Sequence, residues 1–194
     1  MTLQKIKDVA FKHFAQHGYD GASLAQIADE VGIKKQSIYT YFKGKDELFL
    51  QLCRDAQENE MGFVLNFIER NAARSIKEFL LDFLVEYIER YEKCDSAKFW
   101  LRTSFYPPHH LYDQVIKQVY ESLDQMEERF LPILRKAVEK GEVSPTVGEK
   151  RATVAFLALL DGICVEMIYG NPERLRRRLE ASWYVYWRGL AGNG

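Results

Sequence analysis

Apolar residues recur every three or four positions along most of the 194-residue chain, and this spacing places them on one face of an α-helix. The pattern predicts helices over about residues 3–17, 23–32, 34–41, 44–68, 75–91, 96–105, 112–141, 149–169 and 171–190. The sequence has no convincing run of the alternating pattern that marks a β-strand. The pattern therefore predicts an all-α protein.

Local signals define several helix ends. Ser23 with Gln26, and Ser75 with Glu78, have the spacing of capping boxes, in which two side chains satisfy backbone N–H groups at a helix start. Gly32 stands where the chain must reverse between two short helices, and glycine readily adopts the positive φ that such a turn needs. We therefore expect a short helix from Ser23 to Gly32.

The stretch of residues 23–48 has the pattern of a helix-turn-helix. Two short helices are joined at Val31-Gly32-Ile33, and the small side chain of Ala28 allows them to approach closely. In this motif the second helix enters the major groove of DNA with its N-terminus first. The apolar residues that can pack the pair together are Leu24, Ile27, Ala28, Val31, Ile33, Ile38 and Phe42.

Charge supports a DNA-binding edge on the second helix. The window 34–45 contains four lysines and no acid, whereas the whole chain has a formal net charge of −1. A local basic stripe is sufficient for nucleic-acid binding. Lys35 and Gln36 are placed to reach base edges, and the following polar residues are placed to reach phosphates. The alternative is that this lysine-rich turn is ordinary solvated surface.

Two stretches resemble the tetracycline-repressor (TetR) family of bacterial regulators. They are KDVAFKHFAQHGYDGASLAQIA and GIKKQSIYTYFKGKDEL, and they cover about residues 5–50. The resemblance implies a recognition helix that begins at residues 34–37 and backbone contacts from the residues that follow. The predicted DNA-binding residues are Ser23, Lys34, Lys35, Gln36, Ser37, Tyr39, Thr40, Tyr41 and Lys45.

The chain is expected to divide into two parts. Residues 1–46 form a three-helix DNA-binding domain, and residues 47–194 form a larger helical ligand-binding and dimerisation domain. The sequence has no clear linker between them, so the fourth helix is expected to act as a rigid lever that belongs to both.

A homodimer is expected because sequence-specific DNA-binding proteins with one short recognition helix usually bind as dimers, which contact two half-sites about 34 Å apart. The TetR resemblance implies that the last two helices pair with those of a second copy in a four-helix bundle. The alternative is that their apolar residues pack only within their own chain. The predicted interface residues are Phe156, Leu159, Leu160, Ile163, Met167, Trp183 and Trp187.

The TetR resemblance also implies a pocket for a small hydrophobic or aromatic effector that releases the repressor from a palindromic operator. Such pockets are mostly apolar with a few polar groups. Aromatic residues at helical spacing equally suit a plain hydrophobic core. The predicted effector residues are Tyr87, Tyr91, Phe99, Trp100, Phe105, Tyr120, Met126 and Phe130.

Other kinds of site are not favoured by the sequence. Three widely spaced cysteines do not suggest disulfides, and the adjacent His109-His110 lack a third metal ligand nearby. The sequence contains neither a nucleophile–base pair at a suggestive spacing nor a phosphate-binding loop, so an enzyme is not expected. No cofactor or metal is expected either. A helical interaction protein remains a second alternative.

The cellular location is predicted to be the cytoplasm. The longest uninterrupted apolar run, Val154 to Leu160, is much shorter than the roughly 20 residues that span a bilayer, and Asp161 ends it.

Overall fold

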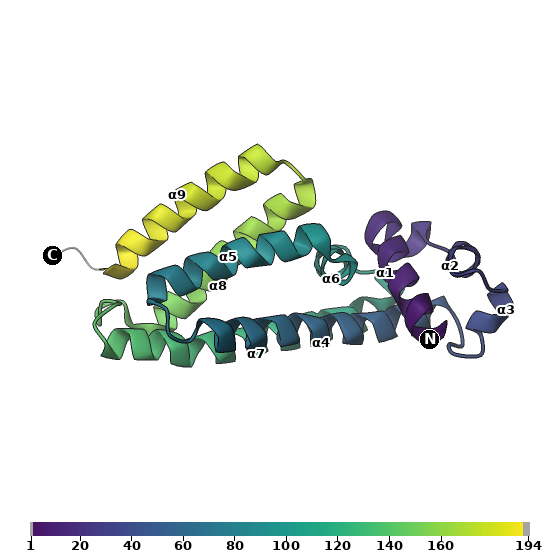
Figure 1. Ribbon diagram of the computed structural model, residues 1–194, viewed down its shortest axis with the longest axis horizontal. Helices are drawn as coiled ribbons and strands as arrows, with labels where there is room; N and C mark the ends of the chain where they lie inside the picture. Colours follow the sequence, from purple (N-terminus) through teal and green to yellow (C-terminus); the bar gives the residue numbers. More distant parts are fainter. Residues whose placement is uncertain (1, 192–194) are drawn as a thin grey trace. The chain divides into compact units, whose positions relative to one another are not determined.

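The computed structural model describes residues 2–191, and every regular element in that range is a helix. The all-α prediction is confirmed. In chain order the elements are α1 (Thr2–Gly21), α2 (Leu24–Val31), α3 (Lys35–Ile38), α4 (Lys45–Asn71), α5 (Ile76–Lys93), α6 (Asp95–Phe105), the 3₁₀ turn η1 (His109–Leu111), α7 (Tyr112–Glu139), α8 (Gly148–Tyr169) and α9 (Pro172–Ala191) (Figure 1).

Both predicted capping boxes form. The Ser23 Oγ accepts a hydrogen bond from the Gln26 backbone N–H at 3.2 Å, and the Gln26 Oε1 accepts one from the Ser23 N–H at 3.1 Å. At the start of α5, the Ser75 N–H donates to the Glu78 Oε2 at 3.3 Å and the Ser75 Oγ accepts from the Glu78 N–H at 3.4 Å. The starts of α2 and α5 are therefore set by local sequence.

Two predicted boundaries differ in detail. The backbone of α1 is kinked at Gly18, where φ is 69° and ψ is −176°, and one further turn follows before Ser23. The helix predicted to end at residue 17 thus kinks at Gly18 and continues to Gly21. The third helix is shorter than predicted, because α3 ends at Ile38 and residues 39–41 continue as turns.

The described chain packs as two compact units. The first unit holds the chain up to Phe63 together with Arg90–Ser122, and the second holds Val64–Glu89 together with the chain from Leu123 onward. Helices α4, α5 and α7 each contribute residues to both units. This division follows packing, whereas the predicted boundary after residue 46 is a division by function.

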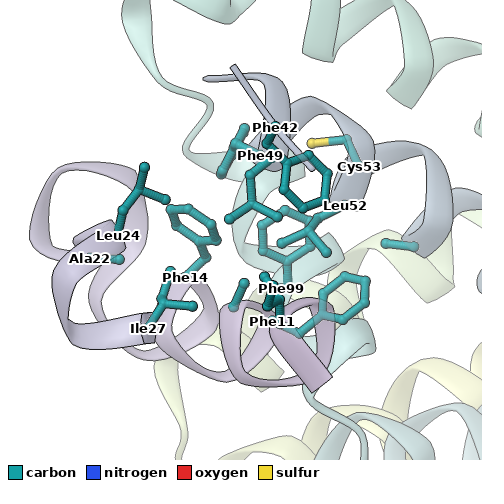
Figure 2. Packing of buried hydrophobic residues seen from close by; sticks show 14 of the residues in the cluster. Phe11, Phe14, Ala22, Leu24, Ile27, Phe42, Phe49, Leu52, Cys53 and Phe99 are labelled. Carbon is teal, nitrogen blue, oxygen red and sulfur yellow. The ribbon is translucent and has the colours of Figure 1, made fainter. Parts of the chain in front are cut away.

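The core of the first unit is a cluster of aromatic and aliphatic side chains from α1, α2, α4 and α6 (Figure 2). The ring of Phe14 meets the ring of Phe49 edge-on at 5.1 Å between centroids, and Phe49 meets Phe99 edge-on at 5.2 Å. Phe99 therefore joins α6 to α1 and α4, the helices before and after the helix-turn-helix.

The core of the second unit is also aromatic. The rings of Phe83 and Phe130 lie 4.8 Å apart, and Phe130 stacks on Phe156 at 5.3 Å. Helices α8 and α9 lie side by side, and the Tyr186 hydroxyl donates to the Ala152 carbonyl at 2.9 Å (Figure 1). By length and composition α8 could cross a bilayer, since its most apolar window has a mean hydropathy of 1.8. Within this unit 44% of that window is buried, so part of α8 contributes to the core.

Candidate nucleic-acid interface

The turn between α2 and α3 is built by Gly32. Its φ of 81° lies in the left-handed region, and its N–H donates to the Ala28 carbonyl at 3.0 Å. The next residue, Ile33, donates to the same carbonyl at 2.9 Å, so the end of α2 is closed tightly. Ile27 and Ile38 are fully buried beneath the pair. The geometry is that of a helix-turn-helix.

The start of α3 is an exposed basic edge. Lys34 stands at the N-cap without a side-chain cap bond, and Lys35 and Gln36 form the first turn in solvent. Of the nine predicted DNA-binding residues, six are exposed and three are half-buried. The exposed residues are Lys34, Lys35, Gln36, Tyr39, Thr40 and Tyr41, and the half-buried ones are Ser23, Ser37 and Lys45.

Ser23 and Lys45 have specific partners in the structure. The Ser23 hydroxyl belongs to the cap of α2, where it also donates to the Gln26 Oε1 at 2.8 Å. The Lys45 ammonium lies 4.1 Å above the centroid of the Tyr19 ring, which is a cation–π distance. Partial burial lowers the pKa of Lys45 from its ordinary value. Lys45 is therefore held at a fixed position at the start of α4.

Helix α1 is fastened to α2 by polar contacts. The Lys5 Nζ donates to the Val31 carbonyl at 2.9 Å, and Lys12 and His13 each lie 2.7 Å from the Glu30 carboxylate. The hydrogen bonds from Lys12 and His13 lower the pKa of Glu30. These contacts hold α2 in place, so that α3 is presented on a rigid support.

Residues that sequence reasoning missed surround the first turn of α4. The Tyr19 hydroxyl donates to the Asp46 Oδ1, and the His110 Nε2 lies 3.3 Å from the same oxygen. The Glu47 carboxylate accepts from the Lys43 N–H. The adjacent pair His109-His110 is the signal in the sequence that points to this site.

Comparison with known proteins identifies the family. Residues 6–52 match the model of bacterial regulatory proteins of the tetR family. IcaR of Staphylococcus epidermidis, a negative regulator of the biofilm operon icaADBC, is 34% identical over 94 residues, which are 46% of this chain and 49% of IcaR. Residues 6–52 are therefore a DNA-binding module of the TetR family. The aligned segment thus spans about half the length of IcaR.

Two other similarities extend over nearly the whole chain. The uncharacterized HTH-type transcriptional regulator YezE of Bacillus subtilis is 26% identical over 179 residues, which cover 91% of each chain. The solved structure of FadR from Bacillus subtilis, in complex with stearoyl-CoA, superposes with a TM-score of 0.73 at 17% identity and covers 97% of this chain and 99% of FadR. At that identity the structural likeness shows the fold alone. The named relatives are transcriptional regulators, and the prediction that the chain is not an enzyme is confirmed.

The eight predicted effector residues are distributed over both units. Phe99 and Trp100 are buried in the core of the first unit, and Phe130 is buried in the core of the second. Tyr87 and Met126 are also buried, and Tyr91 is half-buried. Phe105 and Tyr120 are exposed, by 43% and 63%. The large aromatic side chains serve mainly as core, because packing between helices removes the most apolar area from water.

A buried polar group in the first unit was not predicted. Glu60 of α4 is 2% exposed and pairs with Arg90 of α5, whose guanidinium lies 5.0 Å from the Phe63 ring centroid. The Gln57 Nε2 donates to the Gln118 carbonyl of α7 at 3.3 Å. Among the described residues, the Glu60 Oε1 and the Gln118 Oε1 are buried without a hydrogen-bond partner. Buried acceptors of this kind are costly unless a donor satisfies them.

The second unit contains an open pocket of about 150 Å³ near the turn between α4 and α5. Its lining includes the apolar Ile68 and Phe79 and the basic Lys136 and Lys140. Glu142 also lines it and accepts a hydrogen bond from the Ile76 N–H at 2.8 Å. None of the predicted effector residues lines this pocket.

Most of the seven predicted interface residues are buried within their own chain. Phe156, Leu160, Ile163, Met167 and Trp183 are buried in the second unit, while Leu159 and Trp187 are half-buried. Most of the predicted interface side chains therefore pack into their own core, whereas other residues of α8 and α9 face solvent. The exposed residues of the pair include Val154, Ala155, Ala158, Gly162, Tyr169, Tyr184 and Val185.

Helices α8 and α9 are also joined by a buried acid. Glu166 of α8 is 1% exposed, and its two oxygens lie 2.7 Å from the Arg174 Nε and 2.5 Å from the Arg178 Nη1 of α9. A buried carboxylate needs such partners because desolvation disfavours its charge. The two helices therefore present a defined common surface.

Proposed function

We propose that this TetR-family protein is a repressor that binds a palindromic operator as a homodimer and is released by a small effector. The observation that carries the proposal is the exposed basic edge of α3, supported on a helix-turn-helix with a buried apolar interior. IcaR is named as a negative transcriptional regulator, which supports repression as the direction of control. A cytoplasmic location follows from this function.

Dimerisation is proposed through the exposed faces of α8 and α9. On α8 the residues Val154, Ala158 and Gly162 recur at a spacing of four, so they lie along one face of the helix. On α9 the residues Tyr184 and Val185 add exposed apolar area. Small residues on such a face allow close approach of a second copy, whose symmetry would match that of a palindromic operator.

The effector is proposed to be a small, largely apolar molecule. FadR was solved with stearoyl-CoA, which supports an apolar ligand for a protein of this fold. The unpartnered acceptors on Glu60 and Gln118 support a ligand that also carries hydrogen-bond donors. The effector must bind the released conformer more tightly than the DNA-bound one, by about 5.5 kcal/mol for a near-complete switch.

Fluorescence anisotropy with the DNA upstream of the protein's own gene tests the central claim. We expect tight binding that weakens steeply between about 50 and 200 mM salt and exceeds binding to scrambled DNA about a thousandfold. Weak binding with no preference for any upstream sequence would instead favour a helical interaction protein.

Two substitutions separate the proposed roles within the interface. Lys45→Ala should weaken binding to every sequence and flatten the salt dependence, whereas Gln36→Ala should change the preference among operator variants. Lys140→Ala, an exposed lysine of the second unit, is the matched control and should leave both properties unchanged. Equal losses on operator and random DNA for both test variants would contradict the role assignments.

Operator release tests the effector class. An aromatic alcohol, the matching aromatic carboxylate and stearoyl-CoA are added to the protein–DNA complex. A ligand that donates to Glu60 should lose its effect in Glu60→Gln and keep it in Glu58→Gln, an exposed acid on the same helix. An unchanged response in both variants would exclude Glu60 from the effector site.

A further inference from the structure

Three elements of the first unit meet at the start of α4. Tyr19 comes from the turn after the kink in α1, Lys45 and Asp46 from the first turn of α4, and His110 from η1. The Tyr19 hydroxyl and the His110 Nε2 both contact the Asp46 Oδ1, the latter at 3.3 Å. The Tyr19 and His110 rings meet edge to face at 5.0 Å, and the Lys45 ammonium lies over the Tyr19 ring, 4.1 Å from its centroid.

We propose that His110 is a positioning residue for DNA binding, and that its protonation strengthens the hold of the start of α4 on the DNA backbone. The proposal rests on the DNA-binding function proposed above. His110 acts through two residues, because it fixes Asp46 and supports the Tyr19 ring that carries Lys45. It is not itself one of the residues expected to touch DNA.

The surrounding charges set the direction of the effect. The titratable or charged groups that face this cluster are Tyr19 and Asp20 from the end of α1, and Lys45 and Asp46 from α4. The hydrogen bond from Tyr19, and then that from His110, lowers the pKa of Asp46, so its carboxylate is ionised at neutral pH. An ionised carboxylate beside Lys45 opposes the approach of phosphates and attracts the lysine away from them.

Protonation of His110 reverses part of that effect. Histidine is the side chain that ordinarily changes charge between about pH 5 and 8. A charged His110 forms an ion pair with Asp46, which compensates the carboxylate and makes the start of α4 more positive. The N-terminus of a helix already favours anions through its free N–H groups, and the added charge acts in the same direction.

The expected size of the effect is modest. The His110 and Asp46 side chains are about half exposed, so solvent and salt screen the pair. An exposed pair of this kind changes an equilibrium by about two- to fivefold. Operator affinity should therefore rise about two- to fivefold for each His110–Asp46 cluster as the pH falls from about 8 to about 6.

The experiment measures operator binding by the full-length protein at about pH 6 and pH 8, at one fixed ionic strength. The wild type should bind more tightly at the lower pH, and His110→Gln should lose most of that difference. His110→Lys, which carries a permanent charge, should bind tightly at both values. His109→Gln, at the exposed neighbouring position, should keep the wild-type difference.

Several outcomes would overturn the proposal. If both His110 variants keep the wild-type difference in operator affinity between the two pH values, His110 has no role in DNA binding. The same conclusion holds if only His109→Gln loses that difference. A merely structural role for His110 would lower affinity equally at both pH values in His110→Gln, and circular dichroism would reveal a loss of folded protein. Failure of the proposed function looks different, because the wild type would then show no salt-dependent operator binding at either pH, and this proposal would fall with it.

Discussion

The ring of Phe99 in α6 packs edge-on against the ring of Phe11 in α1, with their centroids 5.4 Å apart. The same ring contacts Phe14 and Phe49, and Phe99 is fully buried. Helix α1 also carries the polar contacts that fasten α2. One aromatic side chain of α6 thus connects directly to the support of the helix-turn-helix.

Truncation of this ring should destabilise the protein strongly. Phe99→Ala should lower the free energy of unfolding by about 3–5 kcal/mol, since it leaves a cavity among three other rings. Phe105→Ala, on the same helix but 43% exposed, should change it by less than about 0.5 kcal/mol. Urea denaturation of both variants tests the pair. Similar losses for the two would contradict the core position of Phe99.

The turn of the helix-turn-helix should depend on Gly32. Gly32→Ala should cost about 1–2 kcal/mol, because its φ of 81° is left-handed and a Cβ at this position is strained even without a clash. Gly62→Ala lies inside α4 and meets nothing within 4 Å, so the same change should stabilise by about 0.5–1 kcal/mol. Thermal unfolding should show shifts of opposite sign. Shifts of the same sign would contradict this assignment.

The proposed dimer should be sensitive to a large charged residue on α8. Ala158→Arg should convert the dimer to a monomer, because Ala158 lies between Val154 and Gly162 on the exposed face. Ala73→Arg, which is exposed in the turn between α4 and α5, should leave the dimer intact. Sedimentation velocity distinguishes the states, and operator affinity should fall with the monomer. A dimeric Ala158→Arg variant would exclude this face as the interface.

Two cysteines of the first unit should differ in reactivity. Burial raises the pKa of the Cys53 thiol to about 12, and its side chain is fully buried. Cys94 is half-buried at the start of α6. At about pH 8 a thiol reagent should modify Cys94 and leave Cys53 unmodified until the protein unfolds. Mass spectrometry locates the adducts. Equal labelling of the two cysteines in native protein would contradict the prediction.

The raised pKa of Cys53 also has a consequence for stability. The thiol favours its neutral form in the folded state, so this contribution to stability is complete below the ordinary thiol pKa of 9.0. As the pH rises from 9.0 toward about 12, the thiol ionises in the unfolded state but stays neutral in the folded state, so the unfolded state is stabilised. Denaturation midpoints of the wild type should therefore fall with rising pH more steeply than those of Cys53→Ala. Parallel slopes would contradict the assignment.

Local interactions explain why much of the helix-turn-helix was predictable. The Ser23–Gln26 cap and the Gly32 turn each depend on residues within about one helical turn, and both form as predicted. The lysine-bearing edge was equally predictable from the sequence, because Lys34 and Lys35 follow the turn directly. Lys45 was predicted to contact the DNA backbone, whereas its cation–π position over Tyr19 depends on the fold of α1.

By itself the sequence determined the helical class, the caps and the charge of the recognition edge, because neighbouring residues suffice to set these features. Tertiary structure alone decided which aromatic side chains form cores, since the direction of Phe99 or Phe156 depends on helices distant along the chain. It also brought His110 to Asp46 across 64 positions. No periodicity encodes that contact, because it is produced by packing α1, α4 and η1 together.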